Sequence, residues 1–207
     1  MIRLETDGPI WTVTLDRPDK ANSLTGDMLV EVARIADAAS EDAEIRALIL
    51  TGAGGKVFSA GADLEEARAG LATSPLWEEV SSRIAALPCL TIAALNGTLA
   101  GGAFGMALAC DLRIAVPEAR FFYPVAKLGF RPQPSDPGRL RALMGPARTK
   151  LLLLAGQKFS ADEAVAFGLV DRVVAPEHLM DACRDLAADS AAGEAEVLRA
   201  IKAMCDG

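Results

Sequence analysis

The sequence predicts an α/β protein whose buried strands run parallel to one another. The segments RALILTG (46–52) and CLTIAAL (89–95) are apolar throughout, as strands are when both faces of their sheet are covered. Segments with helical periodicity precede these two strands, at 25–39 and at 75–88. Strands that alternate with helices form βαβ units, in which neighbouring strands are parallel.

The remaining elements follow from local patterns. Residues 2–5 and 10–15 read as two strands around the turn Asp7-Gly8-Pro9, and Thr25 is a candidate cap for the helix at 25–39. We expect further strands at 111–116, 120–126 and 171–175, and further helices at 137–144, 146–155, 160–167, 176–191 and 193–204. No repeat, low-complexity segment or linker divides the 207 residues, so we expect one domain over 1–207.

Composition excludes several classes of function. The formal net charge of −7 argues against nucleic acid as a partner. The longest apolar runs are interrupted by Gly, Asn or charge, and the first residues, MIRLETDGPIW, lack the apolar core of a signal peptide, so we expect a cytoplasmic protein with no membrane partner. The four cysteines lack metal-site spacing and His178 is the only histidine, so we expect no metal and no Ser-His-Asp triad.

Two glycine-containing segments follow the two apolar strands. AGAD (60–63) follows the first, and Gly101-Gly102 follows the second, directly before a run that is apolar on every side (103–109). The start of a buried helix carries N–H groups that need a partner. Loops after neighbouring parallel strands meet at one edge of a sheet, so two backbone N–H groups could bind one oxygen as an oxyanion hole. The alternative is that these glycines serve only tight turns and close packing.

Four separated motifs then identify a family. LDRPDKANSL (15–24), VFSAGADL (57–64), ALNGTLAGGAFGMALACDLRIA (94–115) and LLLLAGQKFSADEAVAFGLVDRVV (151–174) together resemble the enoyl-CoA hydratase/isomerase family, the crotonase superfamily. The resemblance implies a spiral of ββα units over 1–175 and a helical C-terminal region over 176–207 that is shorter than in typical members. It implies an acyl-CoA thioester as ligand, with coenzyme A as part of the substrate and no permanently bound cofactor. It also implies a homotrimer or a hexamer.

The resemblance assigns roles to individual positions. The backbone N–H groups of Ala62 and Gly102 match the pair that holds the thioester oxygen. The positions matching coenzyme A contacts are Lys20, Ala21 and Asn22 on the nucleotide side, and Ala60, Asp63 and Leu64 on the adenine and pantetheine side. Lys20 could instead be a solvated turn residue, and Asp63 could be a helix cap before LEEAR.

The catalytic carboxylates of the family are missing. The resemblance places the two glutamates of the hydratases at positions that are Gly105 and Val125 here, and a third carboxylate position used in other branches is Gln133. Neither glycine nor valine can move a proton. Asp136 is the candidate replacement, with Phe130, Pro132 and Pro134 as an apolar wall that could raise its pKa; the alternative is a cap for the next helix.

Three other polar residues lie in the same stretch of sequence, namely Tyr123, Lys127 and Arg131. Tyr123 could be an ordinary strand residue, and the two cations could be surface charges or could bind a carboxylate of an unusual substrate. The sequence therefore indicates an acyl-CoA enzyme with a hydratase-, isomerase- or lyase-type reaction that does not use the two usual glutamates. A catalytically inactive acyl-CoA-binding protein and an assembly protein remain as alternatives.

Overall fold

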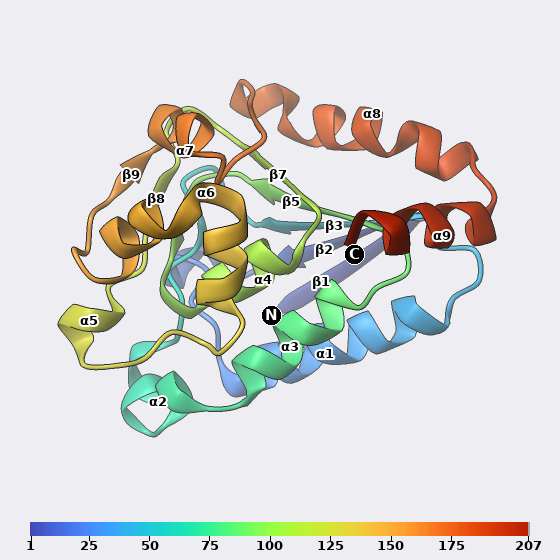
Figure 1. Ribbon diagram of the computed structural model, residues 1–207. Helices are drawn as coiled ribbons and strands as arrows, with labels where there is room; N and C mark the ends of the chain where they lie inside the picture. The colour runs from blue at the N-terminus through green and yellow to red at the C-terminus, as the bar shows by residue number, and fades with distance from the viewer. Residues whose placement is uncertain (207) are drawn as a thin grey trace.

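The computed structural model describes residues 1–206, and within that span ten strands form two sheets flanked by helices (Figure 1). The larger sheet has the strand order β1-β2-β3-β5-β7-β10. Its strands are β1 (Ile2–Asp7), β2 (Ile10–Leu15), β3 (Ala47–Gly52), β5 (Leu90–Leu95), β7 (Leu112–Ala115) and β10 (Arg172–Val173). Only the β1–β2 pair of this sheet is antiparallel, so the predicted parallel α/β class is confirmed.

Helices cover both faces of the larger sheet. Figure 1 shows α1 (Gly26–Glu41) and α3 (Leu76–Ala85) on one side and α8 (Leu179–Ala192) on the other, with α9 (Ala195–Asp206) following it. The predicted cap of α1 is confirmed, because the Thr25 hydroxyl accepts a hydrogen bond from the Met28 N–H at 3.2 Å. Both faces of β3 are consequently buried, which is why its sequence shows no alternation.

A second, smaller sheet was not predicted. It has the order β4-β6-β8-β9, with β4 (Val57–Ser59), β6 (Thr98–Ala100), β8 (Arg120–Phe122) and β9 (Phe159–Ser160). These strands have two or three residues each, too few to show a periodicity in sequence. β4, β6 and β8 each follow a strand of the larger sheet in the chain, so the two sheets are built from successive strand pairs.

Five further helices follow these short strands along the chain. They are α2 (Leu64–Arg68), α4 (Phe104–Ala109), α5 (Val125–Leu128), α6 (Asp136–Leu153) and α7 (Ala161–Phe167), and short 3-10 turns occur at Pro18–Lys20, Leu71–Thr73, Gly101–Ala103 and Pro176–His178. Every residue of α4 is buried, as its sequence predicts. The predicted break between helices at 144 and 146 is confirmed, because Gly145 has non-helical φ and ψ angles of 76° and 169°.

The strand predicted over 120–126 is wrong beyond Phe122. Pro124 follows, and Val125 begins the short helix α5 instead of continuing the strand. Proline has no N–H to donate to a neighbouring strand, so it ends the pairing here. Gly129, with a φ of 75°, then ends α5 in the left-handed conformation that glycine adopts readily.

Candidate functional site

The two glycine-containing segments meet, as the sequence predicts, but at the ends of β4 and β6 in the smaller sheet. β4 and β6 are parallel neighbours, and the chain leaves them toward Gly61 and Gly101. A Cβ atom built on Gly61 would lie 3.0 Å from the Ala100 carbonyl oxygen and 3.3 Å from the Gly102 nitrogen. Gly61 and Gly101 also have positive φ angles, 90° and 58°. Glycine is therefore needed at this contact for both its missing side chain and its backbone conformation.

The N–H groups of Ala62 and Gly102 lie beside this contact. Ala62 pairs with Leu24 as an isolated parallel bridge, whose two hydrogen bonds involve the Gly61 carbonyl and the Asp63 N–H and leave the Ala62 N–H unused. Gly102 belongs to the first turn of a 3-10 helix, where N–H groups have no acceptor within the helix. Ala62 and Gly102 both line the same pocket.

The turn at residues 20–22 is bonded to the first of these loops. The Ala60 N–H donates to the Ala21 carbonyl at 3.0 Å, and the Ser59 hydroxyl donates to the Asn22 carbonyl at 2.8 Å. The Asn22 side chain is buried, donates to the carbonyls of Ala53 and Val57 at 2.9 and 2.8 Å, and accepts from the Arg17 N–H at 3.0 Å. The Asn22 backbone N–H also donates to the Arg17 carbonyl at 2.9 Å, so both the side chain and the backbone of Asn22 hold the loop in place.

We predict that Asn22→Ala lowers the free energy of unfolding by about 2–3 kcal/mol. The change leaves the half-buried Ala53 carbonyl and the Arg17 N–H without these partners, and the Val57 carbonyl keeps only the Asn96 side chain at 3.5 Å. It also places alanine at a φ of 50°, which asparagine tolerates better. Denaturant titration measures the effect. Lys20→Ala, at an exposed position of the same turn, is the control and should stay within about 0.5 kcal/mol of the wild type. Equal stability of the two variants would contradict this assignment.

The positions predicted around the first loop have different surroundings. Ala60 and Leu64 line the pocket. The Asp63 carboxylate accepts from the N–H groups of Glu65 and Glu66 at 3.0 and 3.4 Å, so the cap alternative is confirmed for this residue. Asp63 also forms an ion pair with Arg17 at 2.8 Å, and the hydrogen bond from Arg17 lowers the pKa of Asp63. Lys20 is exposed on the adjoining turn.

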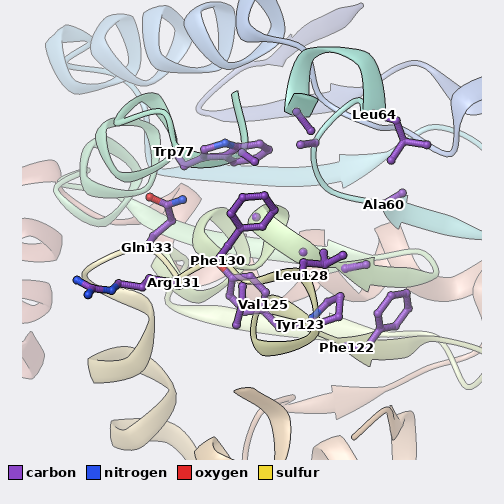
Figure 2. Close-up of a pocket in the computed structure, with 17 residues that line it drawn as sticks. Ala60, Leu64, Trp77, Phe122, Tyr123, Val125, Leu128, Phe130, Arg131 and Gln133 are labelled. Atoms are coloured by element: carbon purple, nitrogen blue, oxygen red, sulfur yellow. The ribbon is translucent and has the colours of Figure 1, made fainter. Parts of the chain in front are cut away.

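The pocket between the loops is apolar and holds about 170 Å³. Figure 2 shows Ala60 and Leu64 at one end, Arg131 and Gln133 at the other, and the rings of Trp77 and Phe130 between them. The Trp77 ring lies against Gly102, where an added Cβ would come within 3.1 Å of it. Trp77 was not predicted as a site residue, because a tryptophan on the apolar face of a helix is indistinguishable in sequence from a core residue.

Two of the three positions where the family pattern lacks its carboxylates face this pocket. Val125 and Gln133 line it, and neither carries an ionisable group. Gly105 is the second residue of α4 and is buried, and a Cβ built there would lie 3.3 Å from Asp136 Oδ1. The Asp136 carboxylate, at the start of α6, therefore lies against the point where a side chain at position 105 would begin.

Asp136 is fully buried and does not cap its helix. Ser135 occupies the cap position, and the Asp136 Oδ2 atom accepts a hydrogen bond from the Tyr123 hydroxyl at 2.9 Å. The Oδ1 atom has no partner among residues 1–206. The alternative of a helix cap is therefore wrong. Burial raises the pKa of the Asp136 carboxyl from 3.8 to about 7, although the Tyr123 hydrogen bond and the Arg139 charge act in the opposite direction.

Tyr123 also differs from the ordinary strand residue considered as its alternative. It follows β8, is buried, and stacks on Phe104 with ring centroids 5.2 Å apart. Burial raises the pKa of its hydroxyl above the usual range, and the charge of Asp136 adds to this rise. The aromatic ring lines the pocket, while Asp136 does not.

Glu78 positions the start of α6 and was not predicted. It accepts hydrogen bonds from the N–H of Ser135, at 3.2 Å, and from the hydroxyl of the same residue. Burial raises the pKa of Glu78, but the hydrogen bonds from Ser135, the charge of Arg139 and the hydrogen bond from Ser82 together lower it overall. Glu78 and Ser135 are 57 residues apart in sequence, so no local pattern could have identified the pair.

The other candidates lie at or outside the edge of the pocket. Arg131 lines its rim and is exposed, Lys127 is exposed on α5, and His178 is exposed before α8. Cys89, Cys110 and Cys183 are buried free thiols, and Cys205 is exposed. Within the part of the chain that the structure describes, no group of three His, Cys, Asp or Glu side chains could hold a metal ion. None of the helices in residues 1–206 is both long and apolar enough to cross a membrane.

Comparison with known sequences places this chain in a family. The profile of the family described as enoyl-CoA hydratase/isomerase matches residues 5–206. A short-chain-enoyl-CoA hydratase of Clostridium acetobutylicum is 39% identical over 189 residues, which are 89% of this chain and 72% of that protein. A carnitinyl-CoA dehydratase of Citrobacter koseri is 40% identical over 184 residues, 87% of this chain and 70% of that protein.

Solved structures agree with this result. The crystal structure of an enoyl-CoA hydratase from Bacillus anthracis has a TM-score of 0.93 at 33% identity and covers 100% of this chain and 82% of its own. The structure of Pseudomonas aeruginosa DspI has a TM-score of 0.92 at 32% identity, with 100% and 86% covered. The spiral of ββα units implied by the resemblance is therefore confirmed. The chain belongs to the enoyl-CoA hydratase/isomerase family, the crotonase superfamily.

Proposed function

We propose that this protein binds an acyl-CoA thioester in the pocket between its two loops and stabilises an enolate-like form of it. The N–H groups of Ala62 and Gly102 hold the thioester oxygen. The observation that carries this proposal is the contact between the loops, which puts the Gly102 nitrogen 3.3 Å from the Cβ position of Gly61. As negative charge develops on the oxygen, two fixed donors stabilise it more than they stabilise the ground state, which lowers the barrier.

The coenzyme A part of the ligand extends from the Ala60 and Leu64 end of this pocket. The turn at Lys20 and Ala21 is bonded to that end through the Ala60 N–H, so the Lys20 ammonium is available for the phosphates of the nucleotide. Asn22 and Asp63 contribute by holding the loop and its helix in place, because their side-chain polar atoms are already bonded within the protein.

The reaction we propose uses Asp136 in place of the two missing glutamates. Its carboxylate lies beside Gly105, which is three residues after the oxyanion donor Gly102 and therefore about 5–6 Å further along the helix. A single carboxylate near the enolate suits proton transfer to and from substrate carbon. It does not reproduce the activation of water between two glutamates, so we assign an isomerase- or lyase-type reaction.

Calorimetric titration with butyryl-CoA, free coenzyme A and butyrate tests the binding proposal. We expect micromolar affinity for butyryl-CoA, weaker affinity for coenzyme A, and no heat with butyrate. Leu64→Arg, which puts a charged side chain at the mouth of the pocket, should weaken the binding, whereas Val197→Arg, exposed on α9 outside the pocket, should not. Equal titrations with butyryl-CoA and with an unrelated nucleotide would refute the proposal.

We predict that hydration of crotonyl-CoA is far slower than the order of 10 turnovers per second typical of enzymes. Gly105 and Val125 cannot activate water. Loss of the enoyl absorbance, followed with time and compared with an enzyme-free sample, measures the rate. A turnover of about 10 per second would show that the residues replacing the glutamates were wrongly identified.

Binding without turnover is the second candidate function. It is favoured by one observation, the complete burial of Asp136, which keeps its carboxylate out of the pocket lining. Turnover measured against a panel of acyl-CoA thioesters separates the candidates. Tight binding with no conversion of any thioester would favour the inactive form.

A further inference from the structure

Tyr123 is the one side chain of the pocket lining, within residues 1–206, that can exchange a proton. The other lining side chains are aliphatic, aromatic or amide groups, apart from Arg131, whose guanidinium does not deprotonate in proteins. A proton that moves between a bound ligand and the protein therefore passes through the Tyr123 oxygen or through water.

The Tyr123 hydroxyl is connected to a proton acceptor outside the pocket. It donates to Asp136 Oδ2 at 2.9 Å, and the stacked ring of Phe104 holds the phenol in this orientation. Asp136 Oδ1 is buried and has no hydrogen-bond partner in the described part of the chain. A buried carboxylate oxygen without a hydrogen bond lowers the stability of the folded protein. Its presence beside the pocket therefore points to a functional role for Asp136.

Burial and the neighbouring charged groups together set the pKa of Asp136. α3 contributes Glu78, whose charge raises the pKa of Asp136, and α6 itself contributes Arg139, whose charge lowers it. α4 faces it with Gly105 and carries no carboxyl, amino, guanidinium or imidazole group. Burial is the largest effect and brings the pKa to about 7, so both protonation states are accessible near neutral pH.

We propose that Tyr123 is the catalytic residue that exchanges a proton with the carbon next to the thioester carbonyl, and that Asp136 acts through it as a positioning residue and proton store. This inference rests on the acyl-CoA function proposed above. It extends that function by naming which atom meets the substrate and by restricting the reaction to proton transfer at carbon.

Protons and charge balance in the proposed transfer from substrate carbon to Tyr123. The C–H bond next to the carbonyl breaks and its electron pair forms the enolate, whose negative oxygen is held by Ala62 and Gly102. The proton binds to the Tyr123 oxygen, while the original phenolic proton passes to Asp136 Oδ2. The negative charge thus moves from Asp136 to the substrate oxygen, and Tyr123 is neutral before and after. Return of the proton to a different carbon completes an isomerisation without water or another reactant.

Exchange of substrate hydrogen with deuterated water tests this assignment. Butyryl-CoA incubated with the protein in deuterated water should gain deuterium at the carbon next to the carbonyl, detected by mass spectrometry. Tyr123→Phe should reduce the rate at least 100-fold while the dissociation constant of butyryl-CoA stays within about threefold. Val197→Ala, at an exposed position of α9 outside the pocket, is the control and should retain the wild-type rate.

The pH profile separates a proton role of Asp136 from a structural one. The wild-type exchange rate should rise with pH through about 7, because only the ionised carboxylate accepts the proton. Asp136→Asn should lose both the rate and this inflection, and Asp136→Glu should restore the inflection. The pH profile tests the proton transfer independently, so the inference can still be checked if Tyr123→Phe fails to fold.

Two results overturn the inference. One is exchange by Tyr123→Phe within threefold of the wild type. The other is wild-type protein that binds butyryl-CoA but exchanges no faster than the enzyme-free control, in which case the proposed binding stands and the proton transfer does not. Failure to bind butyryl-CoA would instead refute the proposed function itself.

Discussion

Gly102→Pro is expected to reduce thioester turnover by about 100- to 1000-fold while leaving affinity for coenzyme A within a few-fold. Proline has no N–H, so the variant lacks one of the two donors proposed for the developing oxyanion. Loss of one such donor typically raises the barrier by about 3 kcal/mol. The proton exchange of butyryl-CoA described above provides the rate, and calorimetry with coenzyme A provides the affinity.

Gly102→Ala is the matched control for this variant. It adds a Cβ atom in the same place, 3.1 Å from the Trp77 ring, but keeps the N–H group. The φ angle of Gly102 is not in the left-handed region, so alanine fits the backbone there. We expect Gly102→Ala to retain far more activity than Gly102→Pro. If both variants lose activity equally, crowding of Trp77 explains the effect and the donor role is wrong.

The effect of Asp136→Asn on the free energy of unfolding should depend on pH. Relative to the wild type, the variant should be more stable at pH 8 than at pH 4 by roughly 4 kcal/mol. The pKa of Asp136 is about 7 when folded and close to 3.8 when unfolded. Between these values the folded protein holds a proton that the unfolded chain has released. Unfolding therefore releases a proton, so stability of the wild type falls as pH rises from about 4 to 7. Above pH 7 the Asp136 carboxyl is ionised in both states and no longer changes the stability of the wild type.

Denaturant titrations at several pH values measure this difference. Asparagine cannot ionise, and the penalty for its unpaired amide is the same at both pH values, so it cancels from the comparison. Asp19→Asn, which replaces an exposed aspartate, should show no such pH-dependent difference. A constant effect of Asp136→Asn from pH 4 to pH 8 would mean that the buried carboxylate titrates in its ordinary range.

The fold and the candidate site were predictable to different degrees. β3 and β5 are apolar throughout and α1 has a cap and a continuous apolar face, so these elements carry their own signal. β4 and β6 have only three residues each, and their strand structure depends on pairing with one another. For this reason the sequence did not predict them. The family resemblance assigned the oxyanion role to Ala62 and Gly102, and the structure places both beside the contact where Gly61 is required by the backbone geometry. Their role as donors stays a prediction.

The sequence by itself determined the α/β class, the family and the absence of carboxylates at positions 105 and 125, because each depends on which residues occur at which spacing. Tertiary structure alone decided that Asp136 is buried against Gly105 and Tyr123 rather than capping its helix. Burial and a hydrogen bond across 13 residues depend on the packing of α3, α4 and α6. The sequence does not record whether an aspartate lies in water or in an apolar interior, but the pKa of its carboxyl differs between the two.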